Sequence, residues 1–453
     1  MNFTISPKPP VYANTPGVFN QTFEITQHQK RIQENFFMDE SIWKELYDNI
    51  SSAPLKSTIV GFNVNLDRII TVTPELLSSP LLNLPILSEL RSRLLHSMET
   101  CTAEEWFVTD PQMYQQFTRL FADYGHRVIG GQAGIAAVHL ASIGISNVLC
   151  ITHSVGPDTK KILTDAGVHL LDLKVDNESS SDTIHLIFEY PPGLVPLVKG
   201  GTPRNNRFIA SPAHTPKSVL IPCDRMDALN QWIAQYTCAF LSGYQYLQND
   251  EEFCMAADQC RLMKKNNNRM RVHVECVSVT DNKIINGFLH HILPVADSIG
   301  LNEHELVLLL HSLNLKHEEP GIFEILSPVQ LVKGALLICK KSGLKRLHLH
   351  TFGYYVQVLR NDCANPEKSL NALLFAARAV AQAAQGTHRE ISPAGLSAIV
   401  EVDKTFGPQI SPGIFRNNTH TIVMIPTIIA KNIKKSSGLG DILSSSAFVA
   451  DQF

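Results

Sequence analysis

The stretch TIVGFN, residues 58–63, is a short and nearly continuous apolar run that ends in a polar residue. Such runs are typical of buried strands in a parallel sheet, because helices cover both faces of these strands. Further segments of the same form are residues 147–152, 239–241, 272–274, 298–301 and 347–350. The sequence therefore predicts a set of short core strands distributed along most of the chain.

Helical patterns lie between these strands. The segment 327–343 begins with Ser-Pro and ends at a glycine, and the segment 365–386 begins with Asn-Pro and also ends at a glycine. Proline in the first turn and glycine after the last turn are typical of helix boundaries. Strands that alternate with helices predict right-handed crossovers and an α/β fold with a mainly parallel sheet. Ligands bind such sheets at the carboxyl ends of the strands.

Two regions depart from this alternation. Residues 71–124 have a helical pattern without a clear core strand, whereas residues 170–218 predict strands, most plainly at 184–190 (IHLIFEY). We interpret these strands, with part of the first region, as a small sheet that projects from the main layer and acts as a lid. A surface hairpin without a functional role is the alternative.

Composition and charge exclude several classes of protein. Hydrophobic residues make up 44% and charged residues 18% of the 453 residues, and the formal net charge is -3. This is ordinary globular composition, with no overall field that would attract nucleic acid or an anionic membrane. No apolar run approaches the ~20 residues of a membrane span. Residues 1–27 show no secretory signal, so we expect an irregular lead-in over residues 1–40 and a cytoplasmic location.

The nine cysteines are scattered and form no C-x-x-C pair. This spacing argues against a cysteine-based zinc site and against a disulfide framework, and it fits a reducing compartment.

The segment KKSSGLGDILS, residues 434–444, carries the clearest chemical pattern. Gly438 and Gly440 flank Leu439, and Asp441 follows directly before a helical pattern over residues 442–451. Glycines allow backbone N–H groups to approach an anion, and a helix start adds further donors. Asp441 could then accept a proton from a hydroxyl that receives a phosphoryl group. The alternative is a loop glycine followed by an Asp N-cap.

Two polar segments could bind a sugar. Asn63, Asn65 and Asp67 alternate, so in an extended chain their side chains point to one side, where two amides and a carboxylate suit several hydroxyls. A turn cluster is the alternative. The glycine-rich segment 130–137 (GGQAGIAA) permits close ligand approach beside the amide of Gln132, or serves tight packing of a helix. It is neither a G-x-G-x-x-G motif nor a P-loop.

Carboxylates and histidines also lie near predicted strand ends. Glu275 ends one strand and Glu305 follows another, and such carboxylates could hold Mg²⁺ through water molecules. Solvated loop charges are the alternative. His348 and His350 share one strand face and could be metal ligands, although we favour a structural or adenine-side role.

The order of these motifs resembles that of the ADP-dependent sugar kinases of the ribokinase-like superfamily, and most closely the eukaryotic ADP-dependent glucokinases. The resemblance runs from about residue 57 to the C-terminus. Residues 63–67 and 130–134 resemble the family's two sugar-binding segments. Residues 185–190 and 206–209 resemble lid strands, residues 273–275 and 302–305 resemble magnesium-associated motifs, and residues 438–441 resemble the anion hole and catalytic base.

The resemblance implies a three-layer α/β/α domain with a smaller β-rich lid domain. The large domain would comprise residues 41–67, 125–172 and 219–453, and the lid residues 68–124 and 173–218. It also implies transfer of the β-phosphoryl group of ADP to the 6-hydroxyl of glucose, giving glucose 6-phosphate and AMP. Mg²⁺ would be the cofactor, and a monomer with ADP and glucose as its small-molecule partners is expected.

The resemblance further implies a role for each motif residue. Asp441 would be the base, and N–H groups of Gly438, Leu439 and Gly440 would bind the transferred group. The metal would be associated with Glu275, Glu305 and Asp441. The sugar would be held by Asn63, Asn65, Asp67, Glu105, Gly131, Gln132 and His185. The nucleotide would be bound by Arg207, Asn302, His350, Thr351, Lys435 and Gly440.

Glu105, rather than Glu104, is expected to be the lid carboxylate that contacts glucose. If neither reaches the sugar, an ADP-dependent phosphofructokinase becomes the better interpretation. Lys435 stands where the family carries an arginine, which removes a bidentate fork and predicts weaker nucleotide binding. Residues 436–437 and 442–443 also depart from the family pattern. An ATP-dependent ribokinase-like carbohydrate or nucleoside kinase and a catalytically weakened sugar-binding relative remain as alternatives.

Overall fold

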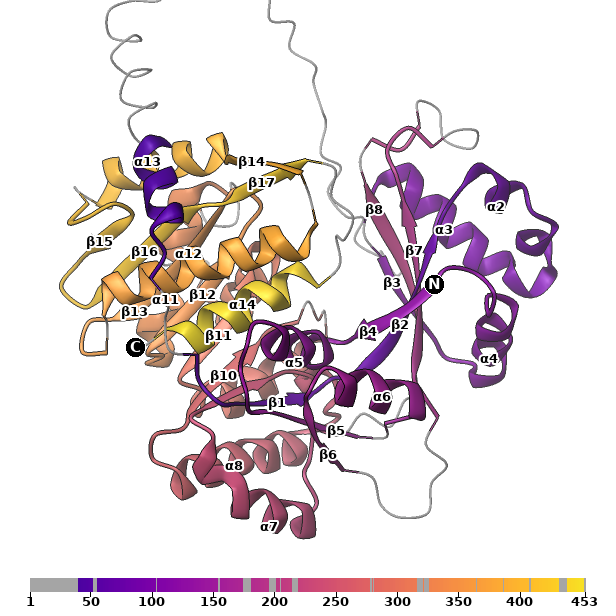
Figure 1. Cartoon of the computed structure of the whole chain (residues 1–453), viewed down its shortest axis with the longest axis horizontal. Helices are drawn as coiled ribbons and strands as arrows, with labels where there is room; N and C mark the ends of the chain where they lie inside the picture. Colours follow the sequence, from indigo (N-terminus) through magenta and orange to yellow (C-terminus); the bar gives the residue numbers. More distant parts are fainter. Residues whose placement is uncertain are drawn as a thin grey trace, which may run out of the picture.

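The structure is a computed structural model of the chain (Figure 1). It describes residues 40–51, 55–102, 104–153, 155–173, 181–194, 201–203, 205–213, 219–277, 279, 281–315, 321, 326–363, 365–385, 387–406, 409–431 and 438–451. Residues 1–39 of the predicted lead-in lie outside the described residues, as do Lys435, Ser436 and Ser437.

A ten-stranded sheet forms the centre of the larger part of the molecule. Its order is β15-β16-β13-β12-β11-β10-β9-β1-β5-β6, and every neighbouring pair from β12 to β6 is parallel. The parallel strands are β1 (Thr58–Phe62), β5 (Val148–Thr152), β6 (His169–Asp172), β9 (Cys238–Leu241), β10 (Arg271–Glu275), β11 (Ser298–Asn302) and β12 (Arg346–His350). The antiparallel edge consists of β13 (Tyr354–Arg360), β15 (Ile414–Arg416) and β16 (His420–Pro426). The predicted α/β fold with a mainly parallel sheet is confirmed.

Helices cover both faces of this sheet. Val60 and its neighbours on one face pack with apolar residues of α5 (Gln132–Ser142) and α14 (Leu439–Ala450). Ile59, the preceding residue of β1, belongs to the core of the other face, because successive strand residues point to opposite sides. That face is covered by α8 (Asp250–Asn266), α10 (Glu303–Ser312), α11 (Pro328–Ser342) and α13 (Pro393–Phe406). Helix α12 (Pro366–Ala383) lies beside α14.

A second, five-stranded sheet lies beside the first (Figure 1). Its strands, in spatial order, are β3 (Glu104–Val108), β8 (Asn206–Pro212), β7 (Ile184–Tyr190), β2 (Asn65–Thr71) and β4 (His126–Gly130). One face carries Phe188 and Phe208, which pack in a core with residues of α3 (Ser88–Thr100) and α4 (Pro111–Leu120). The alternating residues on the opposite face can line a cleft. A third, two-stranded sheet pairs β14 (Thr387–Ile391) with β17 (Ile428–Lys431).

Several strands differ from the predictions. Strand β3 lies in the region that was predicted without a strand; it begins with two glutamates, and its conformation is stabilised by pairing with β8. Strand β6 lies at the start of the region interpreted as projecting strands, but it forms the edge of the ten-stranded sheet. Strands β2 and β4 pair in the five-stranded sheet, although residues 65–67 and 126–130 were assigned to the large domain. Pairing between distant segments decides all three placements.

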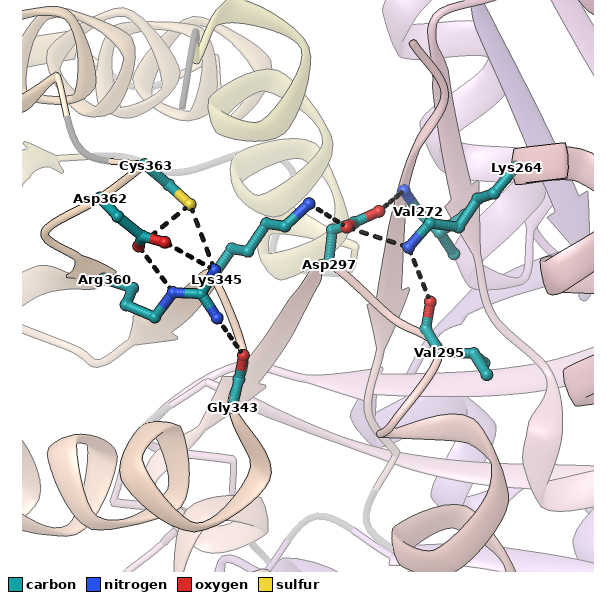
Figure 2. A network of polar contacts seen from close by, with 9 residues as sticks. All are labelled: Lys264, Val272, Val295, Asp297, Gly343, Lys345, Arg360, Asp362 and Cys363. Atoms are coloured by element: carbon teal, nitrogen blue, oxygen red, sulfur yellow. Dashed lines mark hydrogen bonds and ion pairs between the residues drawn. The ribbon is translucent and has the colours of Figure 1, made fainter. Parts of the chain in front are cut away.

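A buried carboxylate fixes the register of the central strands at the edge opposite the predicted site (Figure 2). Asp297, which is 2% exposed, accepts hydrogen bonds from Val272 N (3.0 Å), Lys264 Nζ (3.0 Å) and Lys345 Nζ (2.8 Å). Its own carbonyl oxygen accepts from Arg346 N (3.2 Å). These contacts join the starts of β10, β11 and β12. Consequently the other ends of the three strands, which carry predicted site residues, are held in a fixed relation.

None of the helices within the described ranges is both long and apolar enough to cross a lipid bilayer.

Candidate active site

The first predicted sugar-binding segment lies where the chain passes from one sheet to the other. β1 ends at Phe62, and β2 of the five-stranded sheet begins at Asn65. Asn65 Nδ2 donates to Asp67 Oδ1 (2.7 Å), and both side chains are buried. Since Asn65 and Asp67 are strand residues with their side chains on one face, the alternative of a turn cluster is wrong for this pair.

The second segment contacts the first directly. Gly130 lies against Asp67 and Asn65 so closely that a Cβ there would overlap both side chains. Gly131, at φ +72°, is the N-cap of α5, and the N–H of Ala133 donates to Asn63 O (3.1 Å). Glycine is required at Gly130 because two side chains lie against it, and at Gly131 because of its positive φ and the close backbone of Asn63.

In the two predicted sugar-binding segments, the buried amide oxygens Asn63 Oδ1 and Gln132 Oε1 have no hydrogen-bond partner among the described residues. The Gln132 amide nitrogen donates to Cys276 O (3.2 Å), which connects the start of α5 to the end of β10. Buried polar atoms are normally hydrogen-bonded, so two unpartnered acceptors in neighbouring predicted sugar-binding segments fit a ligand that supplies hydroxyl donors.

The open face of the five-stranded sheet carries the other predicted sugar-binding side chains. Ser211 Oγ donates to Glu105 Oε1 (2.7 Å) and contacts His185 Nδ1 (3.1 Å). His185 is the register partner of Asp67 across β7 and β2. Because the single Ser211 proton goes to Glu105, His185 must carry its proton on Nδ1 in this network.

The two candidate lid glutamates have different surroundings. Glu104 Oε1 forms an ion pair with Arg93 (2.8 Å), whereas Glu105 is exposed on the face that carries His185. Burial raises the pKa of Tyr246, and the charge of Glu105 raises it further, so these two groups interact across the space between the sheets. Tyr246 lies in η4 (Tyr244–Tyr246), which follows β9 of the ten-stranded sheet. Glu105 is therefore the glutamate on the face that carries Ser211 and His185.

The late glycine turn begins a helix as predicted, but three residues earlier. Gly438 is the N-cap of α14 at φ +70°, and Asp441 lies in the first turn. A Cβ on Gly438 would lie 2.6 Å from Ile135 Cδ1, and one on Gly440 would lie 3.1 Å from His350 Nε2. Since Ile135 belongs to α5, the starts of α5 and α14 are neighbours. The positive ends of the two helices thus lie close together, although N–H groups at the start of α5 already donate to Asn63 O.

The predicted metal-associated carboxylates interact with one another. Glu275 is 4% exposed, and burial, followed by the charges of Asp441 and Glu305, raises its pKa well above the usual range. His273 Nε2 contacts Glu275 Oε2 (3.0 Å) and orients it. A buried carboxyl group whose ionisation two other carboxylates oppose is a natural environment for a divalent cation.

Asn302 and Glu305 also have a structural role. Asn302 Oδ1 accepts from Glu305 N (3.0 Å), and Glu305 Oε2 accepts from Asn302 N (2.9 Å), which together form a capping box at the start of α10. The N-x-x-E spacing is typical of this motif, so the sequence carries a signal for a helix start here that the interpretation as a metal-associated motif left out.

The predicted nucleotide-binding residues lie at two places. His350 ends β12, and burial lowers its pKa to about 4, so it is neutral at physiological pH. Thr351 Oγ1 donates to Tyr354 O (2.7 Å), in a turn where Gly353 O accepts from Thr427 N (2.9 Å). Arg207 is on β8, on the same face as Ser211 but four residues, or about 13 Å, along the strand.

His348 is buried next to this region. Neither of its ring nitrogens has a hydrogen-bond partner in the described part of the chain, and burial lowers its pKa well below the usual value.

Sequence reasoning did not identify several residues of this region. Ser211 joins Glu105 to His185, and Tyr246 faces Glu105, but neither belongs to a local motif. A cavity of about 40 Å³ lies next to the carboxylates and is lined by residues that include Tyr244, Gln245, Glu275, Cys276, Phe288 and Glu305.

Comparisons with known proteins agree with this geometry. Residues 56–450 match the family model described as the ADP-specific phosphofructokinase/glucokinase conserved region. The ADP-dependent glucose/glucosamine kinase of Pyrococcus furiosus is 28% identical over 460 residues, which cover 90% of this chain and 98% of the relative. The ADP-specific phosphofructokinase of Pyrococcus abyssi is 27% identical, covering 79% of this chain and 85% of the relative.

A solved structure supports the fold. It is an ADP-dependent kinase in complex with fructose 6-phosphate and ADPβS, with a TM-score of 0.75 and 23% identity, covering 94% of this chain and 98% of that chain. The resemblance inferred from the motif order is thus confirmed, and the chain belongs to the ADP-specific phosphofructokinase/glucokinase family of ADP-dependent sugar kinases.

Proposed function

We propose that the protein transfers the β-phosphoryl group of ADP to the 6-hydroxyl of glucose and releases glucose 6-phosphate and AMP. The observation that supports glucose is the position of Glu105, which lies with Ser211 and His185 on the open face of the five-stranded sheet while Glu104 pairs with Arg93. A carboxylate accepts hydrogen bonds from neutral hydroxyls and repels a phosphate. Together with Asp67, it makes the acceptor side of the cleft negative, which favours an uncharged sugar over fructose 6-phosphate.

In the proposed reaction Asp441 accepts the proton of the 6-hydroxyl. The oxygen then forms a bond to the β-phosphorus, and the bond from that phosphorus to the bridging oxygen breaks, so AMP leaves with the electron pair. N–H groups of Gly438, Leu439 and Gly440, at the positive end of α14, bind the oxygens of the transferred group. The contact between Gly438 and Ile135 keeps this donor group beside the sugar-binding start of α5.

Mg²⁺ is part of the proposal. Glu275 and Glu305 would hold it through water molecules, because within the described residues their ligand atoms and that of Asp441 do not form a close set of three. The raised pKa of Glu275 fits a site in which a cation offsets the mutual repulsion of carboxylates. When bound, the ion would neutralise the charge of the phosphates. Arg207, Lys435 and the turn after His350 would contact the nucleotide.

The test is formation of glucose 6-phosphate with ADP and Mg²⁺, with ATP as the alternative donor and fructose 6-phosphate as the alternative acceptor. Glu105→Gln should lower kcat/KM for glucose by ~10-fold or more, because an ionised hydrogen-bond partner is lost. Glu104→Gln is the matched control and should leave kcat/KM for glucose unchanged. A wild-type preference for fructose 6-phosphate would make the protein a phosphofructokinase, and a preference for ATP would refute the proposed donor.

A further inference from the structure

A second cluster of metal-ligating side chains lies outside the cleft. Asp250 and Cys254 are one turn apart at the start of α8, and His291 lies in the π-helical turn η5 (Phe288–Ile292). One ligand atom from each of the three lies within 4.8 Å of the other two, and no other set of three histidine, cysteine or acidic residues in the described ranges meets this condition. We propose that Asp250, Cys254 and His291 form a binding site for a zinc-class divalent cation.

The geometry of the histidine supports this assignment. His291 Nε2 donates to Asp250 Oδ1 (2.7 Å), and His291 Nδ1 faces Cys254 Sγ (3.4 Å). A neutral imidazole that donates from one nitrogen carries its lone pair on the other, so Nδ1 accepts a hydrogen bond from the thiol of Cys254. This is the carboxylate–histidine arrangement that orients imidazole ligands in metal sites.

The distance between Cys254 Sγ and His291 Nδ1 also fits a shared zinc-class ion. Ligands at the usual Zn–N and Zn–S distances in a tetrahedral site lie about 3.6 Å apart, close to the observed separation of Sγ and Nδ1. A cation can therefore replace the thiol proton of Cys254, which passes to solvent, with little movement of either residue. Asp250 adds an anionic group that stays hydrogen-bonded to Nε2 and holds the ring in this tautomer, and water would complete the shell.

The donor set selects the class of metal. Thiolate and imidazole favour zinc and the later first-row divalent ions, whereas Mg²⁺ prefers oxygen ligands and keeps its waters. The side chain of Asp250 is 81% exposed and that of His291 21%, so ions reach the site from solvent. Glu251 and Glu252 in the same first turn add negative charge.

The sequence alone did not predict this site. Cys254 and His291 are 37 residues apart, so spacing alone predicted no zinc ligands. The π-helical turn brings them together: Leu293 N donates to Phe288 O (2.9 Å), five residues back, and Gly287 admits the ring of Phe253 at close range. Phe288, in the same turn, lines the cavity beside Glu275. A bound ion would thus fasten α8 to the segment that forms one wall of that cavity.

The experiment uses the full chain, freed of metal and returned to buffer with excess Mg²⁺, and Co²⁺ as the probe. Titration should give a thiolate-to-cobalt charge-transfer band in the near ultraviolet that saturates at about one Co²⁺ per chain, and Zn²⁺ should abolish it. Cys254→Ser and His291→Asn should remove the band, and Asp250→Asn should weaken binding by ~10-fold or more. Cys223→Ser, at another exposed cysteine, is the matched control and should keep it.

A second measurement does not depend on cobalt. Zn²⁺ should slow alkylation of Cys254 but not of Cys223, as measured by mass spectrometry of the intact, folded protein. The proposal is overturned if no charge-transfer band forms, if the band survives Cys254→Ser, or if both cysteines are alkylated at rates that Zn²⁺ leaves unchanged.

Discussion

Asp441 has two structural properties besides its proposed catalytic role. It is an acidic residue in the first turn of a helix, where it interacts favourably with the helix dipole, and it influences the ionisation of the buried Glu275. Under the proposed function it is also the base.

Asp441→Asn should therefore lower kcat by ~10²-fold or more, because the amide cannot accept the hydroxyl proton. Binding of glucose and ADP, measured by calorimetry, should stay close to that of the wild type because Asn keeps the shape of the side chain. Near-full turnover in this variant would exclude Asp441 as the base.

Glu275 illustrates how a proposed functional residue can cost stability. Its pKa is raised in the folded protein, so the unfolded chain ionises first and stability falls as the pH rises above the unfolded pKa of about 4.5.

Glu275→Gln should consequently raise the melting temperature at pH 8, by about 1 °C for each kcal/mol of relief in a chain of this length, and change it little near pH 4. Activity should fall in the same variant. Added Mg²⁺ should reduce the difference in melting temperature, since a cation would relieve the same repulsion. Equal melting temperatures at pH 8 would contradict the inferred burial of charge.

At the scale of elements, the start of α14 depends on its contact with α5. Gly438→Ala should be destabilising for two reasons: the positive φ of this residue and the overlap of a Cβ atom with the side chain of Ile135. Gly343→Ala at the end of α11 has a similar φ, +72°, with no atom within 4 Å, so it isolates the backbone cost of about 1 kcal/mol.

Gly438→Ala should be less stable than Gly343→Ala by about 1 to 3 kcal/mol in urea unfolding, the usual cost of overpacking, and should lose activity that Gly343→Ala retains. Ile135→Val should recover part of the loss in the double variant. No recovery would mean that Ile135 is not the obstacle.

The register of the central strands depends on Asp297 (Figure 2). Burial alone would raise its pKa, but hydrogen bonds from Lys345, Val272 N and Lys264 outweigh burial and lower it. Its contribution is therefore present above about pH 4 and is lost as the pH falls through the lowered pKa.

Asp297→Asn should cost about 2 to 3 kcal/mol of unfolding free energy at pH 7, as expected for charged hydrogen bonds to a buried group. Asp362→Asn, which removes the charge of an exposed carboxylate that pairs with Arg360, is the control and should cost less than about 1 kcal/mol. The difference in unfolding free energy between the two variants should become smaller as the pH falls below about 4. Similar losses in both variants would argue against a special role for Asp297.

Elements with local signals could be predicted from the sequence. Helix α11 is bounded by Ser327 and Gly343 as expected, because its capping residues are adjacent to it in the chain. Strand β3 was not predicted as a strand, and residues 65–67 of β2 and strand β4 were assigned to the large domain, because partners distant in the chain decide where these segments pair. The same limit applies to the site: the Asn65 and Asp67 pair is a local pattern, whereas Tyr246 and Ser211 reach the cleft only through the fold.

For the whole molecule, the proposed substrate contacts two sheets. Glu105 and His185 lie on the five-stranded sheet, whereas Gln132 and Asp441 lie on helices packed against the ten-stranded sheet. A ligand that bridges them and binds only the folded protein stabilises it by an amount that grows with the logarithm of the ligand concentration above Kd.

Glucose at 100 times its Kd should add about 2.7 kcal/mol of stability, seen as a rise in melting temperature. Glu105→Gln should reduce the rise at the same glucose concentration, and Glu104→Gln should not. A larger stabilisation by fructose 6-phosphate than by glucose would point to the phosphofructokinase activity instead.

The packing of Ile135 on Gly438 has a consequence for how such an enzyme could be selective. The start of α5, which carries proposed sugar contacts, and the start of α14, which carries the proposed base and anion donors, are packed closely together. Any relative motion of the two sheets then moves the wall with Glu105, His185 and Asp67 relative to these two helix starts. The groups proposed for phosphoryl transfer would already be positioned before a substrate binds. The choice between sugars would depend on the residues of the five-stranded sheet. Substitutions could therefore change sugar specificity in evolution without disturbing the positions of the catalytic groups.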